Sequence, residues 1–376
     1  ILIFGDIILD KWVYGDVKRY SPEAPIPIIN PSKIKYNLGG ASNVAVNLKS
    51  LNVPLKLFGT IGKDSQGLMI KKILKKFKIP NKLFYSPYQT TEKIRYVNHK
   101  NKQLLRVDNE KYFNSKKLIS FFLKNIKKDD LILLSDYKKG VISQNLVKEI
   151  LKINKNIIVD PKNKKNYYKN CFLIKPNMLE FLNWSKTSRF SWRSAEKIKK
   201  EINCKWMIIT NSSKGCYILN DKFKKTIKID KVDVKDVSGS GDIFLSILAY
   251  YMYKNFNIVS SAKLAARVAT LTVKERGISI VNKKYLKHKI VFTNGCFDIL
   301  HRGHLKLLKF SKKIGDKLII GINSDDSVKK LKGKSRPINN IAKRINSLKK
   351  INLADEIIVF NEISPINLIK KIHPDI

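Results

Sequence analysis

The sequence is poor in cysteine and has no long apolar stretch, and each shortage excludes a class of protein. Four cysteines are scattered over 376 residues, which favours neither a disulfide framework nor a cysteine-rich metal site. No stretch approaches the roughly 20 apolar residues needed to span a membrane. The longest apolar run, residues 243–253, is typical of a buried helix. We therefore expect a cytoplasmic protein that does not insert into membranes.

Acidic residues are also scarce, with 30 against 75 basic residues and a formal net charge of +45. Such a charge attracts nucleic acid and other polyanions. However, the lysines are spread almost evenly, and Lys, Asn and Ile are abundant together, as a genome rich in A and T would produce. The chain has neither a single basic arm nor a basic platform interleaved with aromatic residues. We therefore favour compositional drift over specific nucleic-acid binding.

Short apolar runs alternate with helical patterns over the first 281 residues. Four of these runs, each followed by a polar loop, are typical of strands buried on both faces: 131–134, 157–159, 172–174 and 206–209. The alternation predicts a doubly wound, mostly parallel α/β sheet with its site along one edge. Residues 1–4 predict a further strand. Residues 93–98 and 103–108 predict a hairpin that carries Arg95 and Arg106.

Residues 21–29 contain too many prolines for a central strand, so they favour an edge strand or a lid. Residues 33–38 alternate and are expected to pair with them. Earlier in the chain, Asp6 follows the first strand, and we expect Asp10 to close the same turn. Acids at a strand end could hold sugar hydroxyls. A polar loop without a ligand would explain the same acids.

The segment Gly239-Ser240-Gly241-Asp242 leads directly into the longest apolar run. Glycines let the backbone approach a ligand closely, and the unpartnered N–H groups of a helix start attract anions. Asp242 in the first turn could take a proton from a hydroxyl as that hydroxyl attacks a phosphoryl group. The alternative is an ordinary turn followed by an acid at a helix start.

Two further helix starts each allow two interpretations. Gly39 and Gly40 precede a helical pattern in which Asn43 could offer its amide to a sugar, although the small residues could simply pack the helix on the sheet. Asn177 and Glu180 are three residues apart, so both could face one water-bound Mg²⁺. The same spacing is equally natural for a capping box.

These motifs occur in the order found in the ribokinase-like carbohydrate kinases, and the resemblance covers residues 1–281. Residues 20–25, 135–140 and 160–162 further resemble the heptose phosphate kinases. The resemblance implies that Asp242 is the base and that the amides of Gly239, Ser240 and Gly241 form an anion hole. Ser240 stands where the family usually has Ala.

The resemblance also implies the binding residues. Sugar contacts would come from Asp10, Gly39, Gly40, Asn43 and Arg106. Contacts to ATP would come from Asn177, Met178, Leu179, Glu180, Thr210, Ser212 and Gly215, with Asn177 and Glu180 reaching Mg²⁺ through water. The basic partner of a phosphate on the substrate stays open among Arg19, Arg106, Lys138 and Lys162.

Residues 282–289 are charged and lack periodicity, so we interpret them as a linker between domains 1–281 and 290–376. Residues 290–293 predict a strand, and a helix is expected from Leu305. His301 and His304 would present both rings on one side of that helix start, where imidazoles can donate hydrogen bonds to phosphate oxygens. Zinc fits less well, because no third ligand lies nearby in the sequence.

The second segment resembles the H-x-G-H nucleotidyltransferases, most closely the heptose 1-phosphate adenylyltransferases. Residues 318–322 predict its next strand, and the basic stretch 329–336 is expected to be mobile. The nucleotide contacts expected here are Thr293, Asn294, Gly295, Lys332 and Lys334. The last residues resemble the beginning of another strand, so we expect a Rossmann-like domain whose C-terminal part is missing; the N-terminus is also expected to be cropped.

Together the two segments resemble the bifunctional heptose 7-phosphate kinase/heptose 1-phosphate adenylyltransferase family. The resemblance implies a ribokinase-like sheet with a small β lid, small-molecule sugar phosphate substrates, ATP as co-substrate of both reactions, and a homodimer formed through the lid. Two alternatives stay open. One is a ribokinase-like kinase for another sugar with a degenerate second domain. The other is a basic nucleic-acid-binding protein on a decayed enzyme scaffold.

Overall fold

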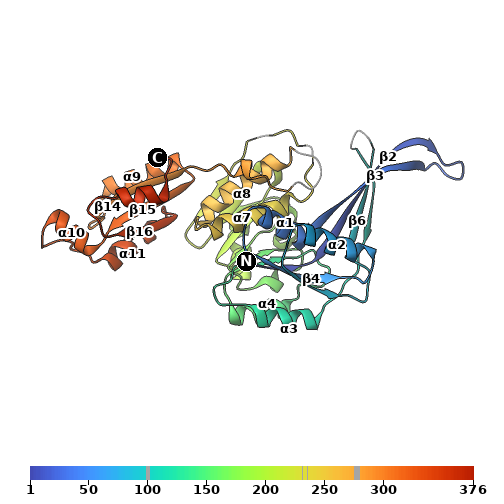
Figure 1. The fold of residues 1–376 in the computed structure, drawn as a ribbon, viewed down its shortest axis with the longest axis horizontal. Helices are drawn as coiled ribbons and strands as arrows, with labels where there is room; N and C mark the ends of the chain where they lie inside the picture. Colours follow the sequence, from blue (N-terminus) through green and yellow to red (C-terminus); the bar gives the residue numbers. More distant parts are fainter. Residues whose placement is uncertain (99–101, 231, 235, 275–279) are drawn as a thin grey trace. The chain divides into compact units, whose positions relative to one another are not determined.

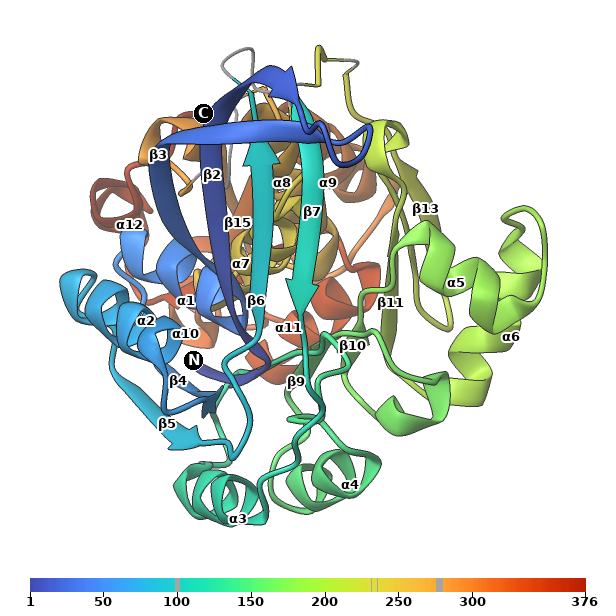
Figure 2. The same ribbon diagram turned by 90° about the vertical axis from the view of Figure 1, so that its right-hand side faces the viewer.

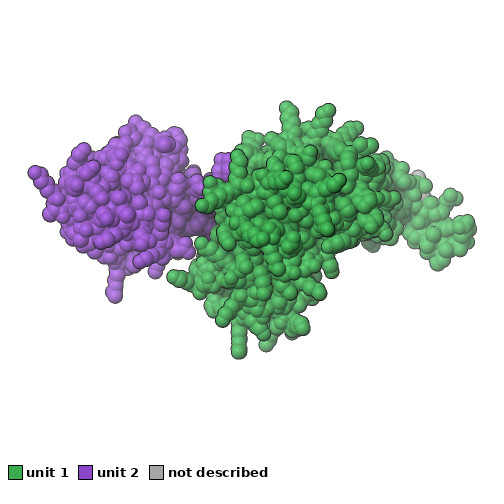
Figure 3. All heavy atoms as spheres, turned by 90° about the horizontal axis from the view of Figure 1, so that it is seen from below, with its two compact units in different colours: residues 1–249, 265–282 green, residues 250–264, 283–376 purple. Residues whose placement is uncertain are grey.

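The computed structural model describes the chain except residues 99–101, 231, 235 and 275–279 (Figure 1). The chain divides into two compact units (Figure 3). The first comprises residues 1–249 and 265–282, and the second comprises residues 250–264 and 283–376. Among the described residues, no helix is both long enough and apolar enough to cross a lipid bilayer.

A nine-stranded sheet forms the centre of the first unit as far as it is described, in the order β13-β12-β11-β10-β9-β8-β1-β4-β5. The strands from β5 to β11 in this order all run parallel to one another. Strand β12 runs antiparallel to both of its neighbours, β11 and β13. The strand bounds are β1 Leu2–Gly5, β4 Lys56–Ile61, β5 Asn81–Tyr85, β8 Ile132–Ser135, β9 Ile157–Asp160, β10 Leu173–Ile174, β11 Trp206–Thr210, β12 Cys216–Leu219 and β13 Lys224–Ile227. The predicted doubly wound, mostly parallel sheet is therefore confirmed.

Helices cover both faces of this sheet, because its central strands are apolar on both sides. Leu2 and Phe4 of β1 pack into the core under α3 to α6, where the Phe122 ring lies 4.5 Å from that of Phe4. Figure 1 shows α3 and α4 on the side opposite α1 and α7. The helices are α1 Ala41–Ser50, α2 Ser65–Lys76, α3 Lys116–Asn125, α4 Gln144–Ile153, α5 Met178–Ser185, α6 Trp192–Ile202, α7 Ser240–Tyr253 and α8 Ile258–Thr272, with short 3-10 turns at Lys165–Tyr168 and Ser212–Lys214.

A separate four-stranded sheet, which we call the lid, has the order β3-β2-β6-β7 (Figure 2). Its strands are β2 Ile7–Tyr20, β3 Pro27–Gly40, β6 Glu92–Val97 and β7 Gln103–Asn109. The predicted hairpin is confirmed, with Arg95 opposite Arg106. The edge or lid placement of residues 21–29 is also confirmed: residues 27–29 begin the edge strand β3, and Pro22 and Pro25 lie in the connection between β2 and β3.

Two details of the lid correct the sequence analysis. Residues 33–38 do not pair with 21–29; they belong to β3 and pair with β2, from Lys33 opposite Tyr14 to Leu38 opposite Leu9. Asp10 does not close a turn after the first strand, because it lies within β2. In both cases the chain extends into one long strand, and short alternating patterns did not reveal that length.

The second unit contains a parallel three-stranded sheet in the order β14-β15-β16. Its strands are β14 Ile290–Gly295, β15 Lys317–Asn323 and β16 Glu356–Phe360, and its helices are α9 Arg302–Ile314, α10 Asp325–Lys332, α11 Ile341–Ile351 and α12 Ile366–Ile372. The N–H of Phe292 donates to the Ile376 carbonyl (2.9 Å), so the last residues run beside β14. Residues 283–286 of the predicted linker form a 3-10 turn.

The prediction that residues 329–336 are mobile is partly wrong, because α10 continues through Lys332. Ser324 caps this helix by accepting from the N–H of Ser327, and Asp325 and Asp326 occupy its first turn. Its lysines lie in the last turn, where the helix dipole favours them. The helix dipole therefore gives the lysines of α10 a structural explanation that needs no bound ligand.

Candidate active sites

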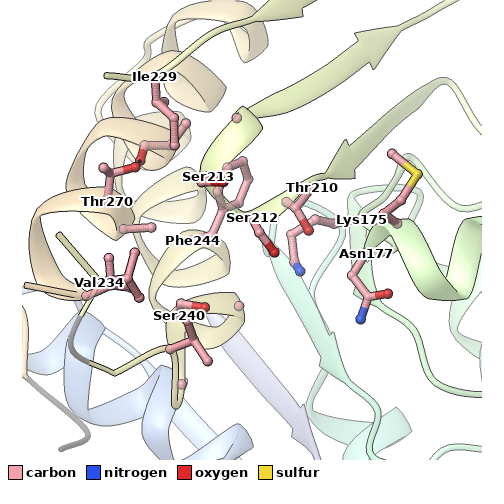
Figure 4. A pocket seen from close by; sticks show the side chains of 18 of the residues that line it. Lys175, Asn177, Thr210, Ser212, Ser213, Ile229, Val234, Ser240, Phe244 and Thr270 are labelled. Atoms are coloured by element: carbon pink, nitrogen blue, oxygen red, sulfur yellow. Dashed lines mark hydrogen bonds between the residues drawn. The ribbon is translucent and has the colours of Figure 1, made fainter. Parts of the chain in front are cut away.

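The first unit contains a cavity of about 530 Å³ at the carboxyl ends of β9, β10 and β11 (Figure 4). In open α/β sheets ligands gather at this edge. Most of the residues predicted to contact the nucleotide line this cavity, together with the glycine loop. The predicted residues that line it are Asn177, Met178, Leu179, Thr210, Ser212, Gly215, Gly239, Ser240 and Gly241. Tyr137, Asp160, Lys162 and Lys175 also line it.

Asp242 lies in the first turn of α7 and is 2% exposed. Its Oδ2 accepts a hydrogen bond from Asn43 Nδ2 (2.9 Å), and its Oδ1 accepts one from the Tyr137 hydroxyl (2.8 Å). Burial raises the pKa of Asp242 to about 7 and Asp160 adds to the rise, whereas the bonds from Asn43 and Tyr137 oppose it. A carboxylate with a pKa close to neutrality suits a general base.

The two glycines before Asp242 have different surroundings, and only Gly239 has a backbone conformation that favours glycine. Gly239 has a φ of +73°, in the left-handed region that side chains disfavour. A Cβ on Gly241 would lie 3.8 Å from Lys175 Nζ, so this backbone faces a cation. The N–H of Ser240 donates to the Val237 carbonyl (3.2 Å), so one of the three amides expected in the anion hole closes the turn.

Lys175 was missed by the sequence analysis. It follows β10 and is 2% exposed, and its Nζ lies 3.1 Å from Asp160 Oδ1 at the end of β9. The only sequence signal was its place directly after a buried strand. A buried cation beside Gly241 provides fixed positive charge next to the helix start, where a phosphate would be stabilised.

Asn177 and Glu180 form the capping box of α5. The Asn177 side chain accepts from the Glu180 N–H (2.9 Å), and Glu180 Oε2 accepts from the Asn177 N–H (2.8 Å). Glu180 also forms an ion pair with Lys162. Burial raises the pKa of Glu180, and Asp160 adds to the rise. The described residues contain no cluster of three or more His, Cys, Asp or Glu side chains able to hold a metal directly.

Asp10 is buried in the lid, where it is paired with Arg95 of β6. Burial raises the pKa of Asp10, although Arg95 and Lys93 oppose the rise. A Cβ on Gly39 would lie 2.4 Å from Asp10 Oδ2, which excludes larger residues there. Arg106 was also predicted to contact the sugar. In the structure it donates two hydrogen bonds, of 2.7 and 2.6 Å, to the carboxylate of Asp108.

The loop after β8 places Tyr137 next to Asp242. A second buried carboxylate, that of Asp6, holds this loop in position. Asp6 Oδ2 accepts from the N–H groups of Tyr137 (2.7 Å) and Lys139 (3.2 Å). Asp6 was predicted only as a loop acid, and its contact with the Tyr137 loop was not predicted, because the two segments are about 130 residues apart. The only local signal was the polar loop after a buried strand.

In the second unit, His301 is the N-cap of α9, which begins at Arg302 rather than at Leu305. Its Nδ1 accepts from the N–H of Gly303 (3.1 Å), and the rings of His301 and His304 lie 3.9 Å apart. Burial lowers the pKa of His304, helped by His301 and Lys332. His304 Nδ1 is buried and has no hydrogen-bond partner among the described residues. Both rings therefore share one helix start, as predicted.

The predicted nucleotide contacts Thr293, Asn294 and Gly295 lie at the end of β14, shortly before this helix start. Lys332 lies close enough to His304 to affect its pKa, whereas Lys334 is exposed beyond α10. Arg344 was missed: it is 1% exposed and donates to the Cys296 carbonyl (2.6 Å) and to Asp325 Oδ1 (2.6 Å). It stabilises the loop between β14 and the histidines.

We predict that Asp242 titrates near pH 7 and that Tyr137→Phe moves its pKa upward, because the substitution removes a hydrogen bond to the ionised form. The measurement is a ¹³C NMR titration of aspartate-labelled protein, with the Asp242 signal assigned by its loss in Asp242→Asn. Tyr112→Phe, at a 60% exposed tyrosine, is the matched control. An unchanged or lower pKa in Tyr137→Phe would contradict the prediction.

Comparison with known proteins assigns both units. The model of the pfkB family of carbohydrate kinases matches residues 3–284, and that of cytidylyltransferase-like proteins matches residues 292–376. The described fold is similar to ribokinase from Thermotoga maritima, with a TM-score of 0.64, 17% identity, and coverage of 76% of this chain and 96% of that one. Phosphofructokinase-2 from Escherichia coli gives a TM-score of 0.66 at 14% identity with the same coverage. These likenesses confirm the predicted ribokinase-like fold.

The curated relatives cover the whole chain. It is 35% identical to the bifunctional protein HldE of a Nitratiruptor species, of which 90% is covered. It is also 35% identical to the bifunctional protein HldE of Haemophilus influenzae, of which 87% is covered. The chain therefore belongs to the family of bifunctional HldE proteins and joins a carbohydrate kinase of the pfkB family to a cytidylyltransferase-like nucleotidyltransferase.

Proposed function

We propose that this enzyme performs two steps in the synthesis of ADP-heptose, a precursor of the lipopolysaccharide core. The first unit phosphorylates heptose 7-phosphate at its anomeric hydroxyl, and the second transfers AMP from ATP to heptose 1-phosphate. A phosphatase must act between the two steps. The observation that carries the kinase step is the buried Asp242 between Asn43 and Tyr137, next to the glycine loop that lines the nucleotide-sized cavity. Because ATP serves both steps, we place the enzyme in the cytoplasm.

In the kinase step, the Asp242 carboxylate takes the proton of the anomeric hydroxyl while that oxygen attacks the γ-phosphorus of ATP. The bond between the γ-phosphorus and the β–γ bridging oxygen breaks, and ADP leaves. Lys175 and the N–H of Gly241 stabilise the charge on the transferred group. Asn43 and Tyr137 orient the base, and Asp10, Gly39, Gly40 and Asn43 hold the sugar.

Mg²⁺ would be held through water by Asn177 and Glu180, and it would neutralise charge on the phosphates. The donor set fits, because a hard cation prefers oxygen ligands and both side chains offer them at one helix start. Their capping bonds hold the two side chains in one orientation. Thr210, Ser212 and Gly215, with Met178 and Leu179, line the rest of the nucleotide site.

In the adenylyltransferase step, an oxygen of the sugar 1-phosphate attacks the α-phosphorus of ATP, and pyrophosphate leaves. His301 and His304 donate hydrogen bonds to the phosphate oxygens and stabilise the charge that develops there. Thr293, Asn294 and Gly295 contact the nucleotide from the end of β14. Lys332 and Lys334 contact the triphosphate.

We expect Asp242→Asn to lower kinase turnover by about 10²–10⁴-fold, because the substitution removes the general base. The KM for ATP should stay within about twofold, since Asn has nearly the shape of Asp. The measurement is a coupled assay of ADP release with heptose 7-phosphate, and Asp221→Asn, at an 81% exposed side chain, is the control. Turnover of Asp242→Asn like that of the wild type would remove Asp242 from its role.

The same assay separates the alternatives. A kinase for another sugar would use unphosphorylated heptose at least as well as heptose 7-phosphate. A nucleic-acid-binding protein would turn over no ATP and would bind RNA with an affinity that falls steeply with salt.

We expect His304→Ala to slow formation of ADP-heptose strongly while leaving the kinase rate unchanged, because the two reactions use different units. Loss of one preorganised hydrogen-bond donor costs about 10²–10³-fold in turnover. Pyrophosphate release with heptose 1-phosphate measures the second reaction, and His373→Ala near the chain end is the matched control. Retention of adenylyl transfer by His304→Ala would remove His304 from its proposed role.

We further propose a homodimer formed through the lid. Large apolar side chains are exposed on it, among them Tyr20 at 67%, Ile26 at 57%, Ile34 at 48% and Leu105 at 54%. Clustered exposed apolar groups mark association surfaces. Ile34→Asp should therefore convert a dimer into a monomer in light scattering, whereas Leu68→Asp, at a 66% exposed residue of α2, should not. A monomeric wild type would contradict the proposal.

A further inference from the structure

One face of the lid carries a cluster of charged side chains, and of these the mechanism above uses only Asp10. Lys93 lies opposite Asp10 of β2 and opposite Asp108 of β7, so the three side chains project from the same face. Arg95 and Arg106 are the next pair on that face. Asp10, a predicted sugar contact, therefore shares its surface with several cations.

Two lysines from different segments converge on one carboxylate in this cluster. Lys93 Nζ lies 3.5 Å from Glu110 Oε1 and 3.8 Å from Asp108 Oδ2. Lys139, from the loop after β8, forms an ion pair with Glu110 Oε2. The side chains of Lys93 and Lys139 are only 14% and 19% exposed. Arg106 also pairs with Asp108. Three cations therefore share two carboxylates, which leaves an excess of positive charge that suits an additional anion.

The cluster lies on the sugar side of the reacting centre. Lys93 Nζ is 6.0 Å from the centre of the Tyr137 ring, and the hydroxyl of that ring contacts Asp242. Lys162 is also 6.0 Å from this ring, but it pairs with Glu180 of the capping box at the start of α5. The two lysines therefore have different neighbours. Lys162 belongs with the nucleotide, and Lys93 belongs with Asp10.

Two of the other candidate partners for the sugar's phosphate, Arg106 and Arg19, are less suitable. Arg106 is 42% exposed at its side chain and is bound by both oxygens of Asp108. Arg19 is exposed near the far end of β2, about nine residues along the strand from Asp10.

We propose that Lys93 and Lys139 bind the phosphate monoester of the sugar substrate, with Glu110 holding the two ammonium groups in place until the phosphate binds. The assignment rests on the proposed function, because a substrate that offers its anomeric hydroxyl to Asp242 needs a cationic site roughly one sugar ring away. It makes Lys93 and Lys139 the residues that distinguish a sugar phosphate from a free sugar. A phosphate dianion bonds to both lysines more strongly than one carboxylate does.

The proposal predicts opposite effects for the two partners of each ion pair. Lys93→Met and Lys139→Met should each raise the KM for heptose 7-phosphate at least 10-fold and leave the KM for ATP unchanged, because a hydrogen bond between charged groups is lost. Glu110→Gln should leave that KM unchanged or lower it, because it removes a competing anion. Lys93→Arg should retain most of the affinity, and Lys102→Met, at an exposed lysine of the same hairpin, is the control.

Binding of inorganic phosphate tests the cluster independently of turnover. With the nucleotide site filled by ADP, equilibrium dialysis of radiolabelled phosphate should show binding that Lys93→Met weakens at least 10-fold and Glu110→Gln strengthens. If both substitutions weaken phosphate binding alike, or if Lys93→Met binds like the wild type, the cluster is only structural and the proposal is overturned. Failure of the wild type to phosphorylate heptose 7-phosphate, with this opposite pattern intact, would instead overturn the proposed substrate.

Discussion

The kinase unit depends on one buried carboxylate. Asp242 loses its hydration at the first turn of α7, and this loss raises its pKa to about 7. Hydrogen bonds from Asn43 and Tyr137 offset part of the cost and orient both oxygens. The three residues come from α1, the loop after β8 and α7, so the fold must bring three distant segments together before the proposed base has its hydrogen-bond partners. Tyr137 follows a parallel strand of the main sheet, whereas Asn43 follows the lid strand β3, so the site needs both sheets in place.

The distribution of acidic residues follows from the same constraint. The chain has 30 acids against 75 basic residues, yet many acids that it retains are buried beside the reacting centre. Asp10 is held by Arg95, Asp160 by Lys175, and Glu180 by Lys162. A buried carboxylate needs a fixed partner, whereas an exposed lysine does not. The excess of lysine is therefore compatible with an unspecialised surface, while these three acids near the proposed site each have a fixed cation as partner.

The architecture was largely predictable because its signals are local. Apolar runs such as 131–134 and 157–159 identified buried parallel strands, and the glycines before Asp242 identified a helix start able to face an anion. The lid was predicted less completely: its hairpin was found, but residues 33–38 were paired with the wrong segment. Strand pairing depends on register between distant residues, which alternation of side chains leaves open.

By itself, the sequence determined which residues could do chemistry: Asp242 after its glycines, Asn177 and Glu180 three apart, and the histidine pair His301 and His304. Their spacing within a single helix start sets their relative positions, since the geometry of one helical turn is constant. Only the tertiary structure decided the partners of these residues. Three contacts join segments whose sequences do not indicate that they meet. These are the hydrogen bond from Tyr137 to Asp242, the ion pair of Lys175 with Asp160, and the two lysines around Glu110. Such contacts form only when packing of the sheet brings those segments together, so their energies depend on the whole fold.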